Sequence, residues 1–471
     1  MDDMRKSLLR RLPSVDSVLS DPRLEDYRVR LGARVVAGTI RETIDELREQ
    51  IAGASGPESC ETDPRETILT EIVGKLGRLT APFHRSVVNG MGIVLHTGLG
   101  RAVLAPRALE QIQETLQGYS LLQVDPTTGK RSARDGRIEW LLQQLTGAEA
   151  ATVVNNNAAA TSIVLNTVAE GREVIVSRGQ LVEIGGSFRL PEIMAFSGAR
   201  LVEVGATNRT HARDYENAIT ENTAAILRVH PSNYKIQGFS SEVPLDVLTK
   251  IAHDNDLVLI DDVGAGSLID FSQFGFEPEP TLPESIQTGA DIVTSSADKL
   301  IGASQGGIIL GRKKLIDAVR KNQFARIVRV GKLTLAVLEA TLKLFLDEAL
   351  ALREVPTLQM LRRSTDDIKS HAERLASELR DRIASAEVTT IEGFSQMGSG
   401  SLPTQNLLTT LVAIAPECMT AESLAMQLRC GDPSVFARIK DDRVLIDPRT
   451  LRDGDDAAII EALTGILGHG A

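Results

Sequence analysis

The sequence predicts an α/β protein in three parts: a helical N-terminal unit over residues 1–80, a large α/β domain over 81–350, and a small α+β C-terminal domain over 351–471. In the middle of the chain, short β-branched runs alternate with helix-length amphipathic segments. This alternation is typical of βα units that build a mostly parallel sheet with helices on both faces. The length of 471 residues is enough for two or three domains of ordinary size.

Apolar residues predict two helices in the N-terminal unit. They recur at helical spacing in two runs, first Ile40, Ile44, Leu47 and Ile51, then Ile68, Ile72, Leu76 and Leu79. The stretch 52–64 between the runs contains several Gly and Pro residues, so it is the best candidate for a linker.

Seven strands and a long helix are expected in the large domain. The strands are Ala151–Val154, Glu173–Val176, Arg200–Val204, Ala224–Val229, Leu257–Ile260, Ile292–Thr294 and Gly307–Leu310. After the last strand, the apolar pattern of Leu333–Leu352 predicts one long helix that leads out of the domain.

The C-terminal domain is expected to combine helices with an antiparallel hairpin. Its predicted elements are a helix at Asp366–Ala384, strands near Val388–Ile391 and Leu407–Ala413, a hairpin of Ala437–Lys440 with Arg443–Asp447, and a closing helix at Ala457–Leu467.

The composition is that of an ordinary globular protein. Lys and Arg number 52 against 63 Asp and Glu, and the net charge of −11 argues weakly against general nucleic-acid binding. No apolar run approaches the roughly 18 residues that span a bilayer, and Met1–Leu12 lacks the apolar stretch of a signal peptide. Cys60, Cys418 and Cys430 lack the spacing of a disulfide framework or a zinc site. We therefore expect a cytoplasmic protein without a membrane segment or a metal site.

Familiar nucleotide-binding signatures are missing from the sequence. It contains no GxxxxGK[ST] phosphate loop. The fragments Gly98-Leu99-Gly100 and Gly264-Ala265-Gly266 do not continue to the third glycine of a dinucleotide fingerprint. A nicotinamide-dependent dehydrogenase is therefore disfavoured.

Three strand ends together predict a cofactor site. The run Asn155–Ala160 opens a helix, where free backbone N–H groups and the helix dipole suit a phosphate. Asp261 and Asp262 end a buried strand, where carboxylates are costly unless they meet a cation. Lys299, in Ser296-Ala297-Asp298-Lys299, follows a third strand, where partial desolvation would lower the lysine pKa and suit Schiff-base chemistry.

A phosphate-binding turn, then an acid, then S-x-x-K is the layout of pyridoxal phosphate enzymes of the aminotransferase-like fold (fold type I). The acid, Asp262, would pair with the protonated pyridine nitrogen and keep the ring an electron sink. The 37 residues from Asp262 to Lys299 fit that fold. Taken singly, Asp262 is as plausible a helix cap and Lys299 a surface lysine, but the joint pattern favours the cofactor site.

Several longer motifs are similar to those of one family. They are Asn89–Thr97 followed by Leu99-Gly100-Arg101, Thr146–Ala150, Ser177-Arg178-Gly179, Leu181–Ser187, Thr207–His211, Ser232-Asn233-Tyr234, Lys332–Leu335 and Gln396–Pro403. On these motifs the chain resembles the bacterial L-seryl-tRNA(Sec) selenium transferases, also called selenocysteine synthases, over essentially its whole length.

The resemblance implies a reaction and its residues. Lys299 matches the lysine that carries pyridoxal phosphate as an internal aldimine. Seryl-tRNA(Sec) would displace it, pass through a dehydroalanyl aldimine, and take selenium from selenophosphate to give selenocysteinyl-tRNA(Sec), with Lys299 as the α-proton base. Asp262 matches the partner of the pyridine nitrogen. The phosphate would be held by Ser296 and by Asn155, Asn156 and Asn157. His230 could stack on or hydrogen-bond the ring, or be an ordinary turn histidine.

The resemblance also implies partners. Arg101, Arg326 and Arg329 fall on positions linked to an oxyanion site for the selenium donor, a role that planar guanidinium groups suit, although exposed or intrachain-paired arginines are the simpler alternative. The N-terminal unit would recognise the tRNA through basic residues, namely Arg5, Lys6, Arg10, Arg11, Arg23, Arg28, Arg30 and Arg34. Members of the family form large ring-shaped homo-oligomers.

Departures from the family pattern leave two rival hypotheses open. Gly98 stands where Asn is usual, Arg137 where His is usual, and Gly331 where Asp is usual. One rival is a paralogous pyridoxal phosphate β-eliminating lyase that acts on a small amino compound, which has no evident need for the N-terminal unit. The other is a tRNA-binding protein that has lost catalysis. Arg449 stands at a position where related folds bind a substrate carboxylate. An aminoacyl ester has no free carboxylate, so this role carries little weight here.

Overall fold

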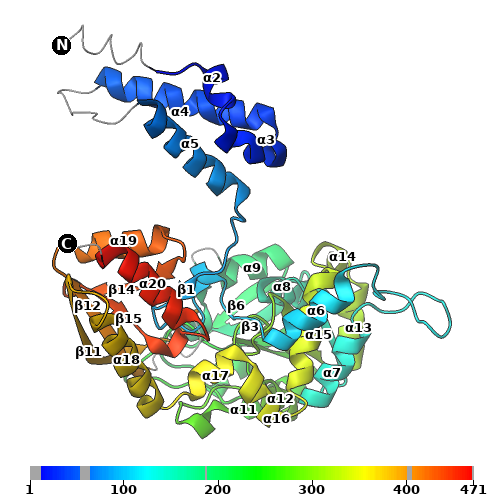
Figure 1. Cartoon of the computed structure of the whole chain (residues 1–471). Coiled ribbons are helices and arrows are strands. Elements are labelled where there is room, and N and C mark those ends of the chain that lie inside the picture. The colour runs from blue at the N-terminus through cyan, green and yellow to red at the C-terminus, as the bar shows by residue number, and fades with distance from the viewer. Residues whose placement is uncertain (1–11, 54–63, 186–187, 400–405, 469–471) are drawn as a thin grey trace. The chain divides into compact units, whose positions relative to one another are not determined.

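The computed structural model describes residues 12–53, 64–185, 188–399 and 406–468. The chain divides into two compact units, Met1–Ser86 and Val87–Ala471 (Figure 1). Several sequence features fall outside the described residues: most of the predicted linker with Cys60, the basic residues Arg5, Lys6, Arg10 and Arg11, and the motif residues Gly186, Ser187 and Gly400–Pro403.

The first unit is helical. It contains α2 (Val15–Leu19), a short 3-10 turn η1 (Pro22–Leu24), α3 (Glu25–Leu31), α4 (Ala33–Gly53) and α5 (Pro64–Thr80). Its core includes Ile40 and Ile44 of α4 with Ile68 and Ile72 of α5, so both predicted helices and their apolar faces are confirmed. Leu79, the last residue of the second apolar run, lies in the last turn of α5 and is 56% exposed.

The second unit is built on a seven-stranded sheet in the order β2-β10-β9-β8-β7-β3-β6. The strands are β2 (Ala150–Val154), β3 (Glu173–Ser177), β6 (Arg200–Val204), β7 (Thr223–Val229), β8 (Val258–Gly264), β9 (Ile292–Ser296) and β10 (Gly307–Gly311). All seven predicted strands are therefore present. Neighbouring strands are parallel except β10, which is antiparallel to both β2 and β9.

Helices cover both faces of this sheet, as predicted (Figure 1). Side chains alternate along each strand, so Ile308 and Leu310 of β10 join one core cluster and Ile309 joins the other. The first cluster includes α7 (Gly136–Thr146) and α15 (Lys332–Leu344), and the second includes α8 (Asn157–Ala169) and α13 (Lys313–Lys321). The other helices of this part of the chain are α6 (Pro106–Leu116), α9 (Leu190–Ser197), α10 (Ala212–Glu216), α11 (Leu245–Asp254), α12 (Leu282–Gln287) and α14 (Phe324–Ile327).

The C-terminal part forms a four-stranded antiparallel sheet in the order β11-β12-β15-β14. The strands are β11 (Ala386–Ser395), β12 (Leu407–Pro416), β14 (Arg438–Lys440) and β15 (Arg443–Ile446), and α18 (Thr365–Arg380), α19 (Ala421–Cys430) and α20 (Asp455–Leu467) pack against it. The predicted hairpin is confirmed, with Asp441 and Asp442 both at positive φ in its turn. A short strand near the start of the unit, β1 (Val88–Asn89), pairs with β13 (Val435–Phe436), so the chain enters this unit along its C-terminal part.

Two sequence-based expectations need correction. The predicted helix Leu333–Leu352 is broken into α15 and α16 (Glu348–Glu354), because the Asp347 carboxylate accepts the backbone N–H groups of Ala349 and Leu350 and caps a new helix. The next helix is α17 (Pro356–Arg362). In addition, β8 and β9 run further than predicted, so that Asp262 and Ser296 lie inside the last residues of their strands rather than after them.

Candidate active site

The order of the strands brings distant parts of the sequence together. Gly307, the first residue of β10, pairs with Val154 at the end of β2 and with Ser296 at the end of β9. Asp262 on β8 pairs with Thr294 on β9. The asparagine turn after β2, the Asp262 carboxylate and the segment that carries Lys299 therefore meet at one edge of the sheet, as expected for the carboxyl ends of parallel strands.

The asparagine turn opens α8 and divides its side chains between two tasks. The Asn156 side chain accepts the N–H of Ala159 and caps the helix. The Asn157 side chain instead donates to Asp262 Oδ1 at 2.8 Å. Gly307 lies so close that a Cβ there would be 2.1 Å from the Asn156 carbonyl oxygen. The N–H of Ala159 is therefore taken, and a phosphate would be bound by the N–H groups that precede it at the start of the helix.

Asp262 is buried, with 3% of its surface exposed, and has hydrogen-bond donors but no ion-pair partner in the part of the chain that the structure describes. Oδ1 accepts from Asn157 and from the N–H of Gly264, and Oδ2 accepts from the Thr161 hydroxyl at 2.8 Å. Burial raises the pKa of this carboxyl, and the hydrogen bonds oppose the rise only in part. A cation placed against Asp262 would remove this penalty.

Lys299 is also buried, with 5% of its surface exposed. Burial lowers the pKa of its amine, the positive charge of Arg101 lowers it further, and the carboxylates of Asp298 and Asp262 oppose both effects. Lys299 Nζ has no hydrogen-bond or ion-pair partner among the residues that the structure describes. A desolvated amine close to Asp262 is suited to carry a carbonyl cofactor.

Arg101 reaches this site from the start of the second unit. Its guanidinium donates to Asp298 Oδ2 at 2.8 Å, and its side chain is 34% exposed. It borders a cavity of about 430 Å³ that Thr97, Asp298, Ser304 and Gln305 also line. Arg101 is thus paired within the chain and also accessible to a ligand in this cavity, which Asp298, the residue before Lys299, also lines.

Arg329 and Arg326 belong to the segment that pairs with the chain at the start of the asparagine turn. Arg329 forms a β-bridge with Val154, and the N–H of Asn155 donates to the carbonyl of Val328 at 3.0 Å. Both arginine side chains are exposed. Their charges, with that of Arg131, help burial to lower the pKa of the Arg134 guanidinium. This cluster of like charges favours an anionic ligand.

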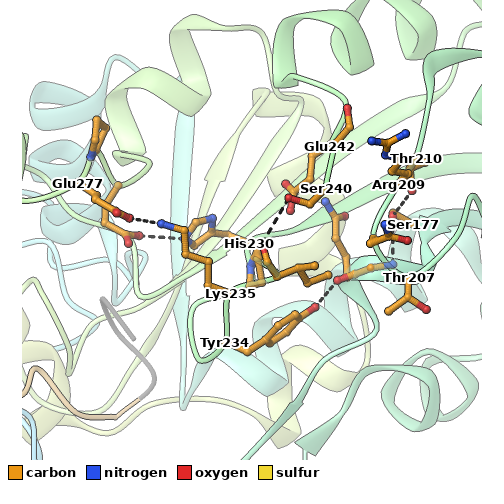
Figure 2. Close-up of a pocket in the computed structure, with 18 residues that line it drawn as sticks. Ser177, Thr207, Arg209, Thr210, His230, Tyr234, Lys235, Ser240, Glu242 and Glu277 are labelled. Carbon is orange, nitrogen blue, oxygen red and sulfur yellow. Dashed lines mark hydrogen bonds and ion pairs between the residues drawn. The ribbon is translucent and has the colours of Figure 1, made fainter. Parts of the chain in front are cut away.

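His230 stands at the end of β7, where its N–H donates to the carbonyl of Asp262 at 2.9 Å. Its imidazole Nε2 lies 2.9 Å from a carboxylate oxygen of Glu279. The imidazole borders a cavity of about 340 Å³ between the ends of β3, β6 and β7, which Figure 2 shows. Lys235 pairs there with Glu277, and the Tyr234 hydroxyl donates to the carbonyl of Gly179. Glu279 therefore occupies one ring nitrogen that was a candidate for bonding the cofactor.

Sequence reasoning missed Thr161 and Asp298, which support Asp262 and Arg101 respectively. Thr161 follows Asn157 by four residues on α8, so both face Asp262, and this helical spacing could have identified it. In the sequence, Asp298 is noticed only as part of the S-x-x-K motif. Nothing in the sequence indicates that it pairs with Arg101, which is 197 residues away along the chain.

The three departures from the family pattern are accommodated locally. A Cβ at Gly98 would lie 3.2 Å from His96 Cε1, whereas a Cβ at Gly331 would meet nothing within 4 Å. The Arg137 guanidinium stacks over the Trp140 ring at 4.4 Å.

These residues fit pyridoxal phosphate. The buried Asp262 carboxylate has no ion-pair partner in the part of the chain that the structure describes, and the Lys299 segment and the first turn of α8 lie at the same end of the sheet. A protonated pyridine nitrogen, an aldehyde and a phosphate are the three groups that these features would receive.

Searches for other kinds of site gave no candidates among the residues described. No helix there is long and apolar enough to cross a membrane. No group of three or more His, Cys, Asp or Glu side chains there is arranged to hold a metal ion. Cys418 and Cys430 are exposed free thiols.

Comparisons with known proteins identify the family. The family model described as L-seryl-tRNA selenium transferase matches residues 87–452, and that described as selenocysteine synthase N terminal matches residues 9–48. The chain is 46% identical over 468 residues to an L-seryl-tRNA(Sec) selenium transferase of Nitratidesulfovibrio vulgaris, covering 98% of this chain and 99% of the relative. It is 45% identical over 467 residues to the protein of that name from Desulfomicrobium baculatum, with the same two coverages.

A solved structure supports the fold. The structure of D-glucosaminate-6-phosphate ammonia-lyase has a TM-score of 0.57 and 22% identity, and the match covers 83% of this chain and 98% of that one. The predicted fold type I architecture with an N-terminal helical unit is confirmed. By its sequence over nearly its full length, the chain belongs to the L-seryl-tRNA selenium transferase family.

Proposed function

We propose that this protein converts seryl-tRNA(Sec) to selenocysteinyl-tRNA(Sec) with pyridoxal phosphate as its cofactor, Lys299 and Asp262 as the residues that hold it, and selenophosphate as the selenium donor. One observation supports this most strongly in a chain of this family: a buried carboxylate, with no ion-pair partner among the described residues, stands at the same end of the sheet as a buried amine.

Each residue of the site has a distinct task in this proposal. Pyridoxal phosphate, when bound, withdraws electrons from the seryl Cα and makes its proton acidic. Asp262 holds the ring nitrogen protonated, and Lys299 Nζ takes the α-proton once it is released from the cofactor. The lowered pKa of Lys299 keeps more of its amine neutral, which a base requires. The cofactor phosphate is bound by Ser296 and by the turn of Asn155, Asn156 and Asn157.

The arginines at the edge of the site are proposed to bind the selenium donor. Arg101 borders the cavity beside Lys299, and Arg329 lies against the asparagine turn with Arg326 nearby. Planar guanidinium groups can each give two hydrogen bonds to an oxyanion. Because Asp298 pairs with Arg101, it would hold that guanidinium in place before the donor binds.

The N-terminal unit is proposed to recognise the tRNA. Arg23 and Arg30 are engaged in ion pairs with acids of their own unit, whereas Arg34 is exposed and has no ion pair among the described residues. Arg34 is therefore a better candidate than Arg23 for contacting phosphates.

The state of Arg449 counts against a lyase for small amino acids. Its side chain is buried, and its N–H groups donate to the Ser395 hydroxyl and to the carbonyl oxygens of Met360 and Leu408. A guanidinium engaged in this way has little capacity left for a free substrate carboxylate. An aminoacyl ester needs no such receptor.

Two further parts of the proposal come from the family. We propose a large ring-shaped homo-oligomer and action in the cytoplasm, where aminoacylated tRNA is used. Size measurement by light scattering tests the first.

The function is tested by mixing the protein with pyridoxal phosphate, seryl-tRNA(Sec) and selenophosphate and identifying the aminoacyl group on the tRNA. Selenocysteine is the expected product. Lys299→Ala should abolish both turnover and the visible absorbance of the bound cofactor, whereas Lys250→Ala, which removes an exposed lysine paired with Asp254, should change neither. Unchanged serine, from protein that holds the cofactor, would instead support the small-molecule lyase.

A further inference from the structure

The segment before Arg101 packs against the C-terminal part of the chain. Val88 and Asn89 pair with β13, and the N–H groups of Val94 and Leu95 donate to the carbonyls of Gln396 and Met397 at 2.9 and 2.7 Å. Gly92 lies against Asp447 so closely that a Cβ there would be 1.9 Å from Oδ2. We call residues 88–101 the strap.

At its end, the strap is fastened by one hydroxyl group. Ser399 Oγ donates to the carbonyl of Leu95 at 2.5 Å and lies 3.0 Å from Thr97 Oγ1. Since the Ser399 proton goes to Leu95, the Thr97 hydroxyl is the donor in the second bond. The two bonds form an ordered chain, from Thr97 to Ser399 to Leu95.

The backbone around Ser399 is built to place that hydroxyl. Gly398 and Ser399 have φ of 80° and 49°, so two successive residues are left-handed. A Cβ at position 398 would lie 2.9 Å from the Leu95 carbonyl oxygen. A non-glycine residue in this conformation is strained and persists where the surroundings require it.

A tight turn connects this fastening to Arg101. His96 Nδ1 accepts the N–H of Leu99 at 3.1 Å, and the N–H of Arg101 donates to the His96 carbonyl at 2.9 Å. Arg101 itself has φ of 65°, and its guanidinium meets Asp298 at 2.8 Å, next to Lys299 in sequence. Three residues therefore separate Thr97 from Arg101, whose charge acts on the Lys299 amine.

We propose that Ser399 is a positioning residue, whose hydroxyl fixes the turn of the strap and thereby holds Arg101 beside Asp298 and Lys299. The role of Arg101 in binding the donor rests on the proposed function, but its placement beside Lys299 does not. Loss of the hydroxyl is expected to loosen the turn, move the Arg101 charge away from Lys299, and raise the pKa of the lysine amine.

The test measures Lys299 directly, in the cofactor-free full-length protein. Competitive acetylation at several pH values, read by peptide mass spectrometry, gives the pKa and reactivity of that amine. Arg101→Gln removes the charge itself, so it gives the largest rise expected in the pKa of the Lys299 amine. Ser399→Gly, which keeps the left-handed backbone at no cost, should give at least half of it, with acetylation at neutral pH slowed about two- to fivefold. Thr97→Val should act in the same direction, and Thr97→Ser should restore wild-type behaviour.

A matched control is Ser385→Ala. The Ser385 hydroxyl also donates to a carbonyl, that of Leu467 at 2.5 Å, but not to the strap, so its loss should leave Lys299 unchanged. Wild-type acetylation in Ser399→Gly would overturn the proposal, and so would an Arg101→Gln variant without effect. In turnover assays, Ser399→Gly should raise KM for selenophosphate and leave KM for the tRNA unchanged. Failure of turnover in every protein, with the acetylation pattern intact, would count against the proposed function alone.

Discussion

The two faces of β8 treat adjacent carboxylates in opposite ways. On one face, Asp261 is completely buried and bonds the Arg228 guanidinium at 2.8 Å. On the other face, Asp262 is almost as buried but is bonded by neutral donors, among them the Asn157 amide, the Thr161 hydroxyl and the Gly264 N–H. Asp261 thus has its cation within the chain, whereas Asp262 has no ion-pair partner among the residues that the structure describes.

This difference separates a structural carboxylate from the one that we propose binds a ligand. A buried acid that serves stability is neutralised by its own fold, as Arg228 does for Asp261. Neutral donors orient Asp262 without cancelling its charge, so the free energy of pairing remains for a cation that arrives later. Exchanging each acid for its amide should therefore give opposite results in activity and in stability.

The largest effect is expected from Asp262→Asn. Loss of the charge that holds the cofactor ring protonated should reduce turnover by a factor on the order of 10² to 10⁴. The free energy of unfolding of the cofactor-free protein should be unchanged or higher, because a buried charge is removed. Steady-state turnover and urea unfolding measure the two quantities. A variant that keeps its activity would remove Asp262 from the site.

Asp261→Asn should show the reverse pattern. It leaves the half-buried Arg228 guanidinium without its carboxylate, and breaking a buried pair costs about 3 kcal/mol in the free energy of unfolding. Turnover per folded molecule should change little, because the side chain faces away from Lys299. Urea unfolding of both amide variants, side by side, gives the comparison. Equal stability loss in the two would contradict the distinction between the faces of β8.

Much of this arrangement could be predicted from the sequence, because it depends on local patterns. Alternating strands and helices predicted the sheet, and the order of the Asn155 turn, Asp262 and Lys299 predicted which strand ends meet. The sequence also matched a family with long, specific motifs, and the residues proposed for the cofactor site lie among them.

What the sequence could not predict depends on contacts between distant residues. Asp261 and Asp262 are adjacent and chemically identical, and only the pairing of β7 with β8 shows that Arg228 serves one of them. The turn Asn155–Asn157 was expected to hold the phosphate, and nothing in the sequence indicated that the Asn157 side chain would bond Asp262. The tie between Ser399 and Leu95 spans 304 residues and follows from no local pattern.

A smaller effect is expected from Thr161→Val. The change preserves the shape of the side chain and removes the donor to Asp262 Oδ2, a bond worth about 1 kcal/mol. Cofactor affinity should fall up to about tenfold, which equilibrium titration of the visible absorbance measures. Thr167→Val is the control, because the Thr167 hydroxyl bonds Ile163 on the same helix and not Asp262. If both variants bind the cofactor alike, Thr161 does not support the acid.

The smallest expected effect is on the pH dependence of the free energy of unfolding. It comes from one carboxyl group, Asp262, so it is measured as a difference between the wild type and Asp262→Asn. Burial raises the pKa of Asp262, so the folded cofactor-free protein binds a proton there more tightly than the unfolded chain does. Stability from this group is present at low pH and is lost as the pH rises through the raised pKa. Subtracting the urea unfolding free energies of Asp262→Asn from those of the wild type should therefore give a difference that declines with rising pH and then levels off. If the free energies of unfolding of the two proteins depend on pH in the same way, burial does not raise the pKa of Asp262. A curve that rises would mean that a cation of the chain already compensates it, in which case Asp262 would resemble Asp261 and the two faces of β8 would not differ.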